Sequence, residues 1–158
     1  MLTQHKYSWG PTICGEFSQA DTDCTEYLNS VGQGTRWMGT YDTGNASTSV
    51  MSPLCPTMTT ASESHSNGQE PCNCNPANGD PSGYSDDYKL WLQTYAEAQM
   101  SAFEQAYGWF YWSWQTESAY QWSYKQALAN GFMPKLAYEP SFKCGDPVPS
   151  FGSLPEAY

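Results

Sequence analysis

The stretch Pro11-Thr12-Ile13-Cys14-Gly15-Glu16-Phe17-Ser18 decides the fold expected for this chain of 158 residues. Its apolar run predicts a short buried strand over residues 12–17. Helix-start residues follow at once, because Asp21 and Asp23 supply acids for a cap and a first turn. A carboxylate at the carboxyl end of a buried strand is where α/β-barrel enzymes place catalytic groups. Glu16 is therefore a candidate nucleophile, and the alternative is an acid favoured only by the dipole of the following helix.

The first half of the chain is expected to contain little regular structure beyond this strand. Residues 12–42 predict the strand and a short helix that Gly32 ends. Residues 43–84 are dense in Ser, Thr, Asn, Gly and Pro, and they hold three cysteines. This composition predicts a long irregular loop that is held by disulfides rather than by a core.

Residues 85–131 predict a helix, a strand and a second helix. Ser85 caps the first helix, whose apolar residues follow the helical period until Gly108 ends it. The aromatic run over residues 109–114 is too short for a helix and predicts a buried strand. A second amphipathic helix is expected over residues 118–130.

The order of these elements, with a tail rich in Pro and Gly over residues 132–158, predicts a parallel α/β sheet with helical crossovers. Two parallel strands need cover on both faces and neighbours at both edges. Residues 1–158 are therefore expected to form a single partial domain, the C-terminal quarter of a (β/α)8 TIM barrel, incomplete or rearranged in isolation. Bare strand edges and apolar faces further predict a homo-oligomer or a different strand pairing.

The composition excludes some partners. The chain has 16 Asp and Glu against 6 Lys and Arg, a net charge of −10, so nucleic acid and anionic membranes are not expected to bind. Aromatic residues make up 16% and charged residues only 14%, which suits neutral hydroxylated ligands such as sugars, although an aromatic core is the simpler explanation. The chain begins with polar residues and shows no signal peptide, and no stretch reaches membrane-spanning length.

The cysteines indicate where the protein resides. Six cysteines predict an oxidising compartment, hence a secreted or cell-wall protein. No metal is expected, because Cys72 and Cys74 are spaced too tightly for zinc and the two histidines stand alone. The pattern Asn45-Ala46-Ser47 is an acceptor for N-glycosylation, which agrees with secretion.

Four stretches carry a resemblance to a known family, and two of them contain candidate site residues. The first runs from Gly15-Glu16-Phe17-Ser18 through Thr22-Asp23-Cys24 to Gly34-Thr35-Arg36-Trp37-Met38-Gly39-Thr40-Tyr41-Asp42. It resembles the nucleophile segment of fungal exo-β-1,3-glucanases of glycoside hydrolase family 5, in clan A. The second, Trp109-Phe110-Tyr111-Trp112-Ser113-Trp114-Gln115-Thr116-Glu117, is similar to the final strand of that family.

The resemblance implies roles for individual residues. Glu16 matches the catalytic nucleophile, and Trp112 matches the tryptophan that lines the subsite of the reacting sugar. The peptide bond between Trp112 and Ser113 is often cis in such enzymes. Phe17, Trp114 and Tyr41 are the other aromatic residues expected to contact β-glucan or an oligosaccharide. No metal or organic cofactor is implied.

The resemblance also implies disulfides. Cys24 and Cys55 match a pair that closes the loop after the nucleophile. Cys144 matches a cysteine near the C-terminus of the family that is bridged to an earlier one. Its partner here stays open among Cys72, Cys74 and Cys14.

The main departure from the family is a missing acid. The family carries its acid/base in an Asn-Glu-Pro motif, whereas the Glu-Pro pairs of this chain, at Glu70 and Glu139, lack the preceding Asn. One hypothesis is a glycosidase part that is inactive alone and completed by a second chain or by the N-terminal part of the barrel. The alternative is a non-catalytic secreted protein that binds glucan or a protein partner, and a weaker third is a disulfide-stapled protein with no sugar ligand.

Overall fold

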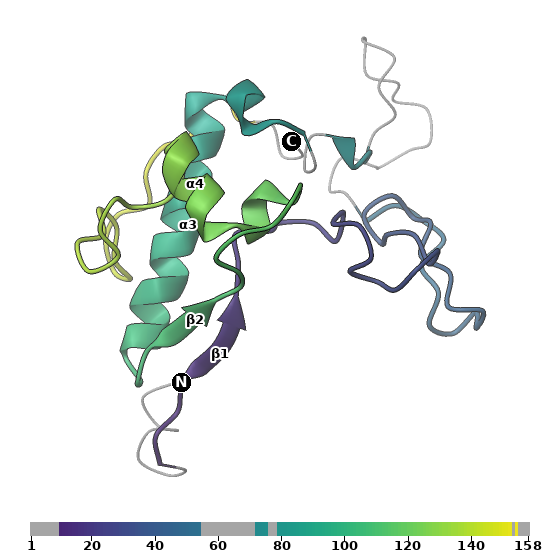
Figure 1. Cartoon of the computed structure of the whole chain (residues 1–158), viewed down its shortest axis with the longest axis horizontal. Helices are drawn as coiled ribbons and strands as arrows, with labels where there is room; N and C mark the ends of the chain where they lie inside the picture. The colour runs from purple at the N-terminus through teal and green to yellow at the C-terminus, as the bar shows by residue number, and fades with distance from the viewer. Residues whose placement is uncertain (1–9, 55–71, 76–78, 153, 155–158) are drawn as a thin grey trace. The chain divides into compact units, whose positions relative to one another are not determined.

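The computed structural model describes residues 10–54, 72–75, 79–152 and 154, which belong to two compact units (Figure 1). The first unit comprises residues 1–19 and 81–153, and the second comprises residues 20–80 and 154–158. All the helices and strands considered below belong to the first unit. In the described part of the chain, no helix has the length and apolar character needed to cross a membrane.

A two-stranded parallel sheet lies at the centre of the first unit. Strand β1 (Cys14–Phe17) pairs with strand β2 (Trp109–Tyr111), and the parallel pairing is the one that alternating strands and helices predict. Cys14 lies opposite Trp109 and Phe17 lies opposite Tyr111. Three residue steps on β1 therefore face two on β2, so one extra residue forms a bulge in β1 at Gly15 and Glu16.

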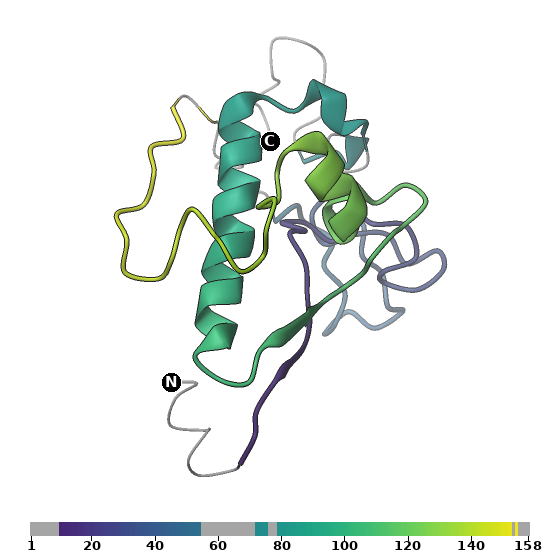
Figure 2. The ribbon, with the colours of Figure 1, turned by 60° about the vertical axis from the view of Figure 1, so that its left-hand side comes forward.

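Helix α3 (Asp86–Glu104) runs beside the two strands, as Figure 2 shows. Ser85 caps it as predicted, because its hydroxyl accepts a hydrogen bond from the N–H of Tyr88 at 3.2 Å. One face of the helix is buried at helical spacing, through Tyr88, Leu92, Ala96 and Met100. The helix ends at Glu104, before the expected stop at Gly108.

The predicted helix over residues 118–130 is shorter than expected. Residues Tyr120–Trp122 form a 3-10 turn (η2), and helix α4 covers only Tyr124–Asn130. Ser123 caps α4 from an extended conformation. The break arises because backbone groups before α4 pair with the segment after β2: the N–H of Ser113 donates to Trp122 O at 2.6 Å. Gly131 ends α4 with a φ of 79°, as predicted.

The helix expected after β1 is absent, since turns occupy residues 26–29 instead. Tyr27 and Ser30 have positive φ angles of 65° and 79°, which a right-handed helix does not allow. The physical reason is the side chain of Asp23. It accepts hydrogen bonds from the backbone N–H groups of Arg36 (2.8 Å) and Trp37 (2.9 Å) rather than capping the residues that follow it.

The two strands are also less buried than predicted. In β1, Gly15 and Glu16 are exposed, and in β2 Phe110 is 61% exposed. Only Phe17 is buried in β1. In the described structure one face of this two-stranded sheet packs against the core and the other face is open to solvent. The expectation of buried strands is therefore wrong for the described structure.

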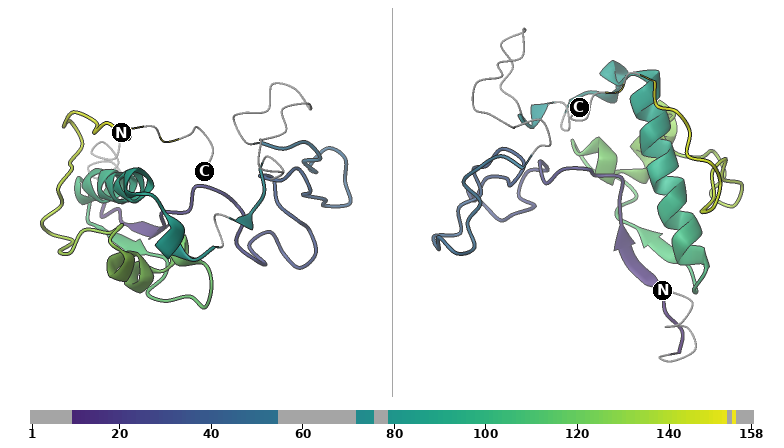
Figure 3. Two further views of the ribbon diagram at one scale, coloured as in Figure 1. Left: turned by 90° about the horizontal axis from the view of Figure 1, so that it is seen from above. Right: turned by 180° about the vertical axis from the view of Figure 1, so that it is seen from behind.

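The tail after α4 runs beside α3 (Figure 3). A buried carboxylate on α3 holds it there. Glu97 is fully buried and accepts hydrogen bonds from the N–H groups of Ser141 (3.0 Å) and Phe142 (2.9 Å) and from the amide of Gln93 (3.0 Å). The hydroxyl of Ser141 lies within 3.1 Å of both carboxylate oxygens. Hydrogen bonds thus hold the tail in place, whereas the sequence predicted that a disulfide would do so.

We expect Glu97→Gln to lower the free energy of unfolding by ~1–3 kcal/mol. A glutamine keeps the size of the side chain but turns an N–H₂ donor toward the N–H donors of the tail. Urea denaturation followed by tryptophan fluorescence measures the change. Glu117→Gln, at an exposed position, is the control. Equal stability of the two variants would contradict the role of Glu97.

Candidate active site

Glu16 lies at the bulged end of β1, and its side chain is exposed. A bulge in a strand redirects a side chain and is common beside active sites. No hydrogen bond or ion pair engages the Glu16 carboxylate among the residues that the structure describes. The carboxylate is therefore presented to solvent at the point where the sequence places a nucleophile.

The chain just beyond Glu16 is fixed by a buried amide. Gln19 is fully buried, and its Nε2 donates to the carbonyl oxygens of Leu92 (3.0 Å) and Phe132. The Tyr111 hydroxyl lies 3.1 Å from Gln19 Oε1 and 2.8 Å from the carbonyl oxygen of Gln121. These contacts connect the end of β1 to α3, to β2 and to the segments on either side of α4.

Two further features reinforce this connection. Burial raises the pKa of Tyr111, so its hydroxyl remains protonated and able to donate. Gln99 on α3 donates from Nε2 to the carbonyl oxygen of Ser18 at 3.0 Å. The backbone just after Glu16 is thus hydrogen-bonded to α3.

Phe17 does not contribute the sugar-binding surface expected of it. Its ring is 7% exposed and makes edge contacts with Phe103, Trp109 and Tyr111, each at a centroid distance of 5.3 Å. The strand alternates its side chains between two faces, so the burial of Phe17 leaves Glu16 on the other face. In this structure Phe17 anchors β1 in the core.

Trp112 lies beside the end of β1. Its N–H donates to the carbonyl oxygen of Phe17 at 2.8 Å, which continues the pairing of the strands beyond β2. The peptide bond between Trp112 and Ser113 is cis. Trp112 is 56% exposed. An exposed indole and an exposed carboxylate are thus carried on adjacent strands at one end of the sheet.

Trp114 is supported by the start of α4. Its ring, 65% exposed, stacks on Tyr124 with centroids 6.0 Å apart and planes 19° apart. The N–H of Lys125 donates to the Trp114 carbonyl oxygen at 3.0 Å. The Lys125 ammonium donates to Gln115 Oε1 at 3.1 Å. Tyr124 and Lys125 were not predicted as site residues. The N-cap Ser123 marks the start of a helix there, but it does not show that this start meets the strand end.

Tyr41, the remaining predicted sugar contact, belongs to the second unit. The guanidinium of Arg36 lies 3.9 Å from the centre of its ring, in a cation–π contact that covers one face. Arg36 is held in turn by Asn29 Oδ1 at 2.8 Å and by Asp23 at 3.4 Å. The structure gives Tyr41 a partner within its own unit.

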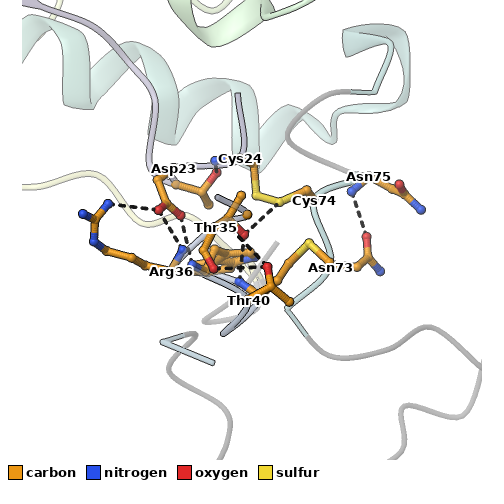
Figure 4. Close-up of a disulfide and its surroundings, with 12 residues drawn as sticks. Asp23, Cys24, Thr35, Arg36, Thr40, Asn73, Cys74 and Asn75 are labelled. Atoms are coloured by element: carbon orange, nitrogen blue, oxygen red, sulfur yellow. Dashed lines mark hydrogen bonds and ion pairs between the residues drawn. A yellow bond between two sulfur atoms is a disulfide. The ribbon is translucent and has the colours of Figure 1, made fainter. Parts of the chain in front are cut away.

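The disulfides differ from those predicted. Cys24 is bonded to Cys74, so the predicted pair of Cys24 with Cys55 is wrong (Figure 4); Cys55 itself lies outside the described residues. Cys72 is also disulfide-bonded, whereas Cys14 and Cys144 are free. The predicted bridge from Cys144 to Cys72, Cys74 or Cys14 is therefore wrong as well.

Two close approaches of the backbone shape this loop. Gly34, with a φ of 71°, leaves no room for a Cβ because Thr40 O lies there. Gly39, with a φ of 68°, packs in the same way against the backbone at Pro53. Both positions require glycine.

The Asp23 carboxylate is the main polar anchor of the second unit (Figure 4). Partial burial by itself would raise the pKa of Asp23. The hydrogen bonds from the N–H groups of Arg36 and Trp37 and from Asn29, together with the charge of Arg36, outweigh burial and lower it below 3.8. The charged form is thus stabilised by folding.

Asp23→Asn should destabilise the chain by ~1–3 kcal/mol at neutral pH, because a neutral amide accepts these bonds more weakly. A lowered pKa in the folded state means that the stabilisation is present above the ordinary pKa of 3.8 and is lost as pH falls through the folded value. Urea midpoints of the two proteins between pH 7 and pH 2 measure this. A difference that stays constant down to pH 2 would contradict it.

The described residues offer no evident metal site. In the part of the chain that the structure describes, no three His, Cys, Asp or Glu side chains are grouped to hold an ion. The candidate chemistry consists of the Glu16 carboxylate and the exposed indoles of Trp112 and Trp114.

Comparison with known proteins relates the chain to a group of fungal enzymes. The chain is 62% identical, over 95% of its length, to glucan 1,3-beta-glucosidase D of Emericella nidulans. It is 61% identical over the same share to the probable glucan 1,3-beta-glucosidase D of Aspergillus terreus and of Aspergillus niger. The chain spans about a sixth (16%) of each relative. No protein family model matches it. The chain is thus closely related in sequence to part of the fungal glucan 1,3-beta-glucosidases.

Proposed function

We propose that this chain carries the nucleophile of a retaining glucan 1,3-β-glucosidase that acts on β-glucan. The observation that carries the proposal is the exposed Glu16 carboxylate at the bulged end of β1, beside Trp112, in a chain 62% identical to part of a glucan 1,3-beta-glucosidase. The assignment to glycoside hydrolase family 5 rests on the resemblance of the two sequence blocks. Secretion is supported by the disulfide between Cys24 and Cys74.

In the proposed reaction, Glu16 attacks the anomeric carbon of the terminal glucose and forms a covalent glycosyl-enzyme. Trp112 provides the apolar surface on which that sugar rests. A second carboxylic acid protonates the leaving oxygen and then activates water, and it lies ~5–5.5 Å from the nucleophile in retaining enzymes. The sequence of this chain has no Asn-Glu-Pro motif to supply that acid. Another polypeptide segment must therefore provide it.

The surface of the first unit is consistent with such a segment. Ile13 and Phe110 are 48% and 61% exposed, although both belong to the sheet region. Within the described residues each strand has a single neighbour. Further parallel strands would cover these residues and pair the open edges. We therefore keep the C-terminal quarter of a (β/α)8 barrel as the proposed architecture, with the earlier barrel strands or a second chain as partner.

The chain alone should hydrolyse an aryl β-glucoside negligibly, with or without Glu16→Gln. A hybrid in which the chain replaces the homologous part of the Emericella nidulans relative should be active. In that hybrid, Glu16→Gln should reduce kcat by ~1,000-fold or more, because the covalent step is lost. Spectrophotometric release of the aryl alcohol measures both.

The matched control is Glu26→Gln in the same hybrid, which removes an exposed carboxylate from the second unit and should leave kcat unchanged. A 2-deoxy-2-fluoroglucoside with a good leaving group should label Glu16, as peptide mass spectrometry would detect. An active hybrid that retains its turnover with Glu16→Gln would overturn the proposed nucleophile.

A second candidate function is binding without catalysis. It is favoured by the alternating exposed rings of Phe110, Trp112 and Trp114 and by the missing acid motif. Such a protein would bind glucan, or a protein partner, through the same aromatic surface.

Titration of the chain with laminarin-type oligosaccharides should change its tryptophan fluorescence. Trp112→Ala and Trp114→Ala should each weaken binding by ~1–3 kcal/mol, by analogy with the loss of stacking on other aromatic platforms. Trp91→Ala, on α3, is the control for loss of a tryptophan. No response from the intact chain would favour a protein partner over glucan.

A further inference from the structure

We propose that Asn45 is an N-glycosylation site with a preformed acceptor geometry. Asn45-Ala46-Ser47 is the single Asn-x-Ser/Thr pattern in the sequence. Asn45 and Ser47 are both exposed, on a loop of the second unit. The inference concerns modification of the chain and does not depend on the proposed glucosidase activity.

The side chains of the pattern contact each other directly. Asn45 Oδ1 accepts hydrogen bonds from the backbone N–H of Ser47 at 2.9 Å and from its hydroxyl at 2.8 Å. A backbone N–H can only donate, so the atom facing it must be the amide oxygen. Asn45 Nδ2 then points away and makes no hydrogen bond with the residues that the structure describes. The reacting nitrogen is unoccupied, while the oxygen of the same amide is held by the serine.

The loop that presents Asn45 is held by contacts that do not use Nδ2. Tyr41 and Val50 close it through two backbone hydrogen bonds of 3.2 and 2.8 Å. Inside it, Asp42 Oδ1 accepts from the N–H of Gly44 at 2.8 Å and from the hydroxyl of Ser49 at 3.2 Å. A glycan on Nδ2 would break none of these bonds.

These contacts are also local. Each joins residues within nine positions of one another, so the turn can form before the Cys24–Cys74 disulfide, which spans 50 positions. This matters because N-glycans are added to a chain as it enters the secretory compartment. The disulfide itself requires an oxidising compartment of the same kind. Both features therefore fit a chain that enters an oxidising secretory compartment.

The modification is a group transfer from a lipid-diphosphate-linked oligosaccharide. The Asn45 Nδ2 forms a bond to the anomeric carbon of the first sugar and loses one proton. The bond between that carbon and the diphosphate oxygen breaks, and the lipid diphosphate leaves with the electron pair. No oxidation or reduction takes place.

The test uses the chain secreted by a fungal host, with intact mass measured before and after treatment with a peptide-N-glycosidase. We expect a glycan mass that the enzyme removes, with conversion of Asn45 to Asp in the tryptic peptide. Asn45→Gln and Ser47→Ala should each abolish the glycan. Ser47→Thr keeps the hydroxyl and should retain it.

Ser49→Ala is the matched loop control. It removes a hydroxyl that contacts Asp42 and the Asn45 carbonyl oxygen (2.9 Å) but leaves the pattern intact, so the glycan should persist. Secreted protein that carries the Cys24–Cys74 disulfide but no glycan would overturn the proposal. So would a glycan that survives Asn45→Gln, which would place it on one of the neighbouring Ser or Thr hydroxyls.

Discussion

The buried amide of Gln19 is the interaction on which the candidate site depends. The amide accepts a hydrogen bond from β2 and donates hydrogen bonds to α3 and to the segment after α4, all within the first unit. A buried amide that lost one of these partners would leave a polar group unsatisfied at a cost of ~1–3 kcal/mol. The contacts therefore specify one position for the end of β1. Because Glu16 lies only three residues earlier, its position is fixed by the same contacts.

The bulge in β1 and the alternation of side chains place the residue that anchors the strand and the candidate functional residue on different faces. Phe17 points into the core, where three aromatic rings surround it, and Glu16 faces solvent. On β2 and just beyond it, the exposed rings extend this open surface, and the stack of Tyr124 on Trp114 supports one of them. In the proposed function, the Glu16 carboxylate and this aromatic surface supply half of the machinery of a retaining glycosidase.

Sequence reasoning succeeded where local interactions decide the structure. Ser85 and Gly131 mark helix ends, because a capping side chain and a residue in the left-handed conformation both bond to backbone groups within one turn of the helix. It failed at Asp23, whose position suggested a helix cap. Its carboxylate instead meets backbone groups 13 and 14 positions away, and no local pattern shows that. The pairing of Cys24 with Cys74 was also missed, because the expected partner, Cys55, came from the family resemblance and not from contacts in space.

The sequence by itself determined the two strands, the main helix, their parallel pairing and the carboxylate at the strand end, because periodicity and capping are encoded within a few residues. Tertiary structure alone decided that Phe17 is core, that Tyr41 is covered by Arg36 and that α4 begins at Tyr124 against the strand end. It also decided which side of Asn45 faces its serine. Each of these depends on which groups meet in space. Hydrogen bonds and ring contacts form between groups that are close in space, whatever their separation along the chain.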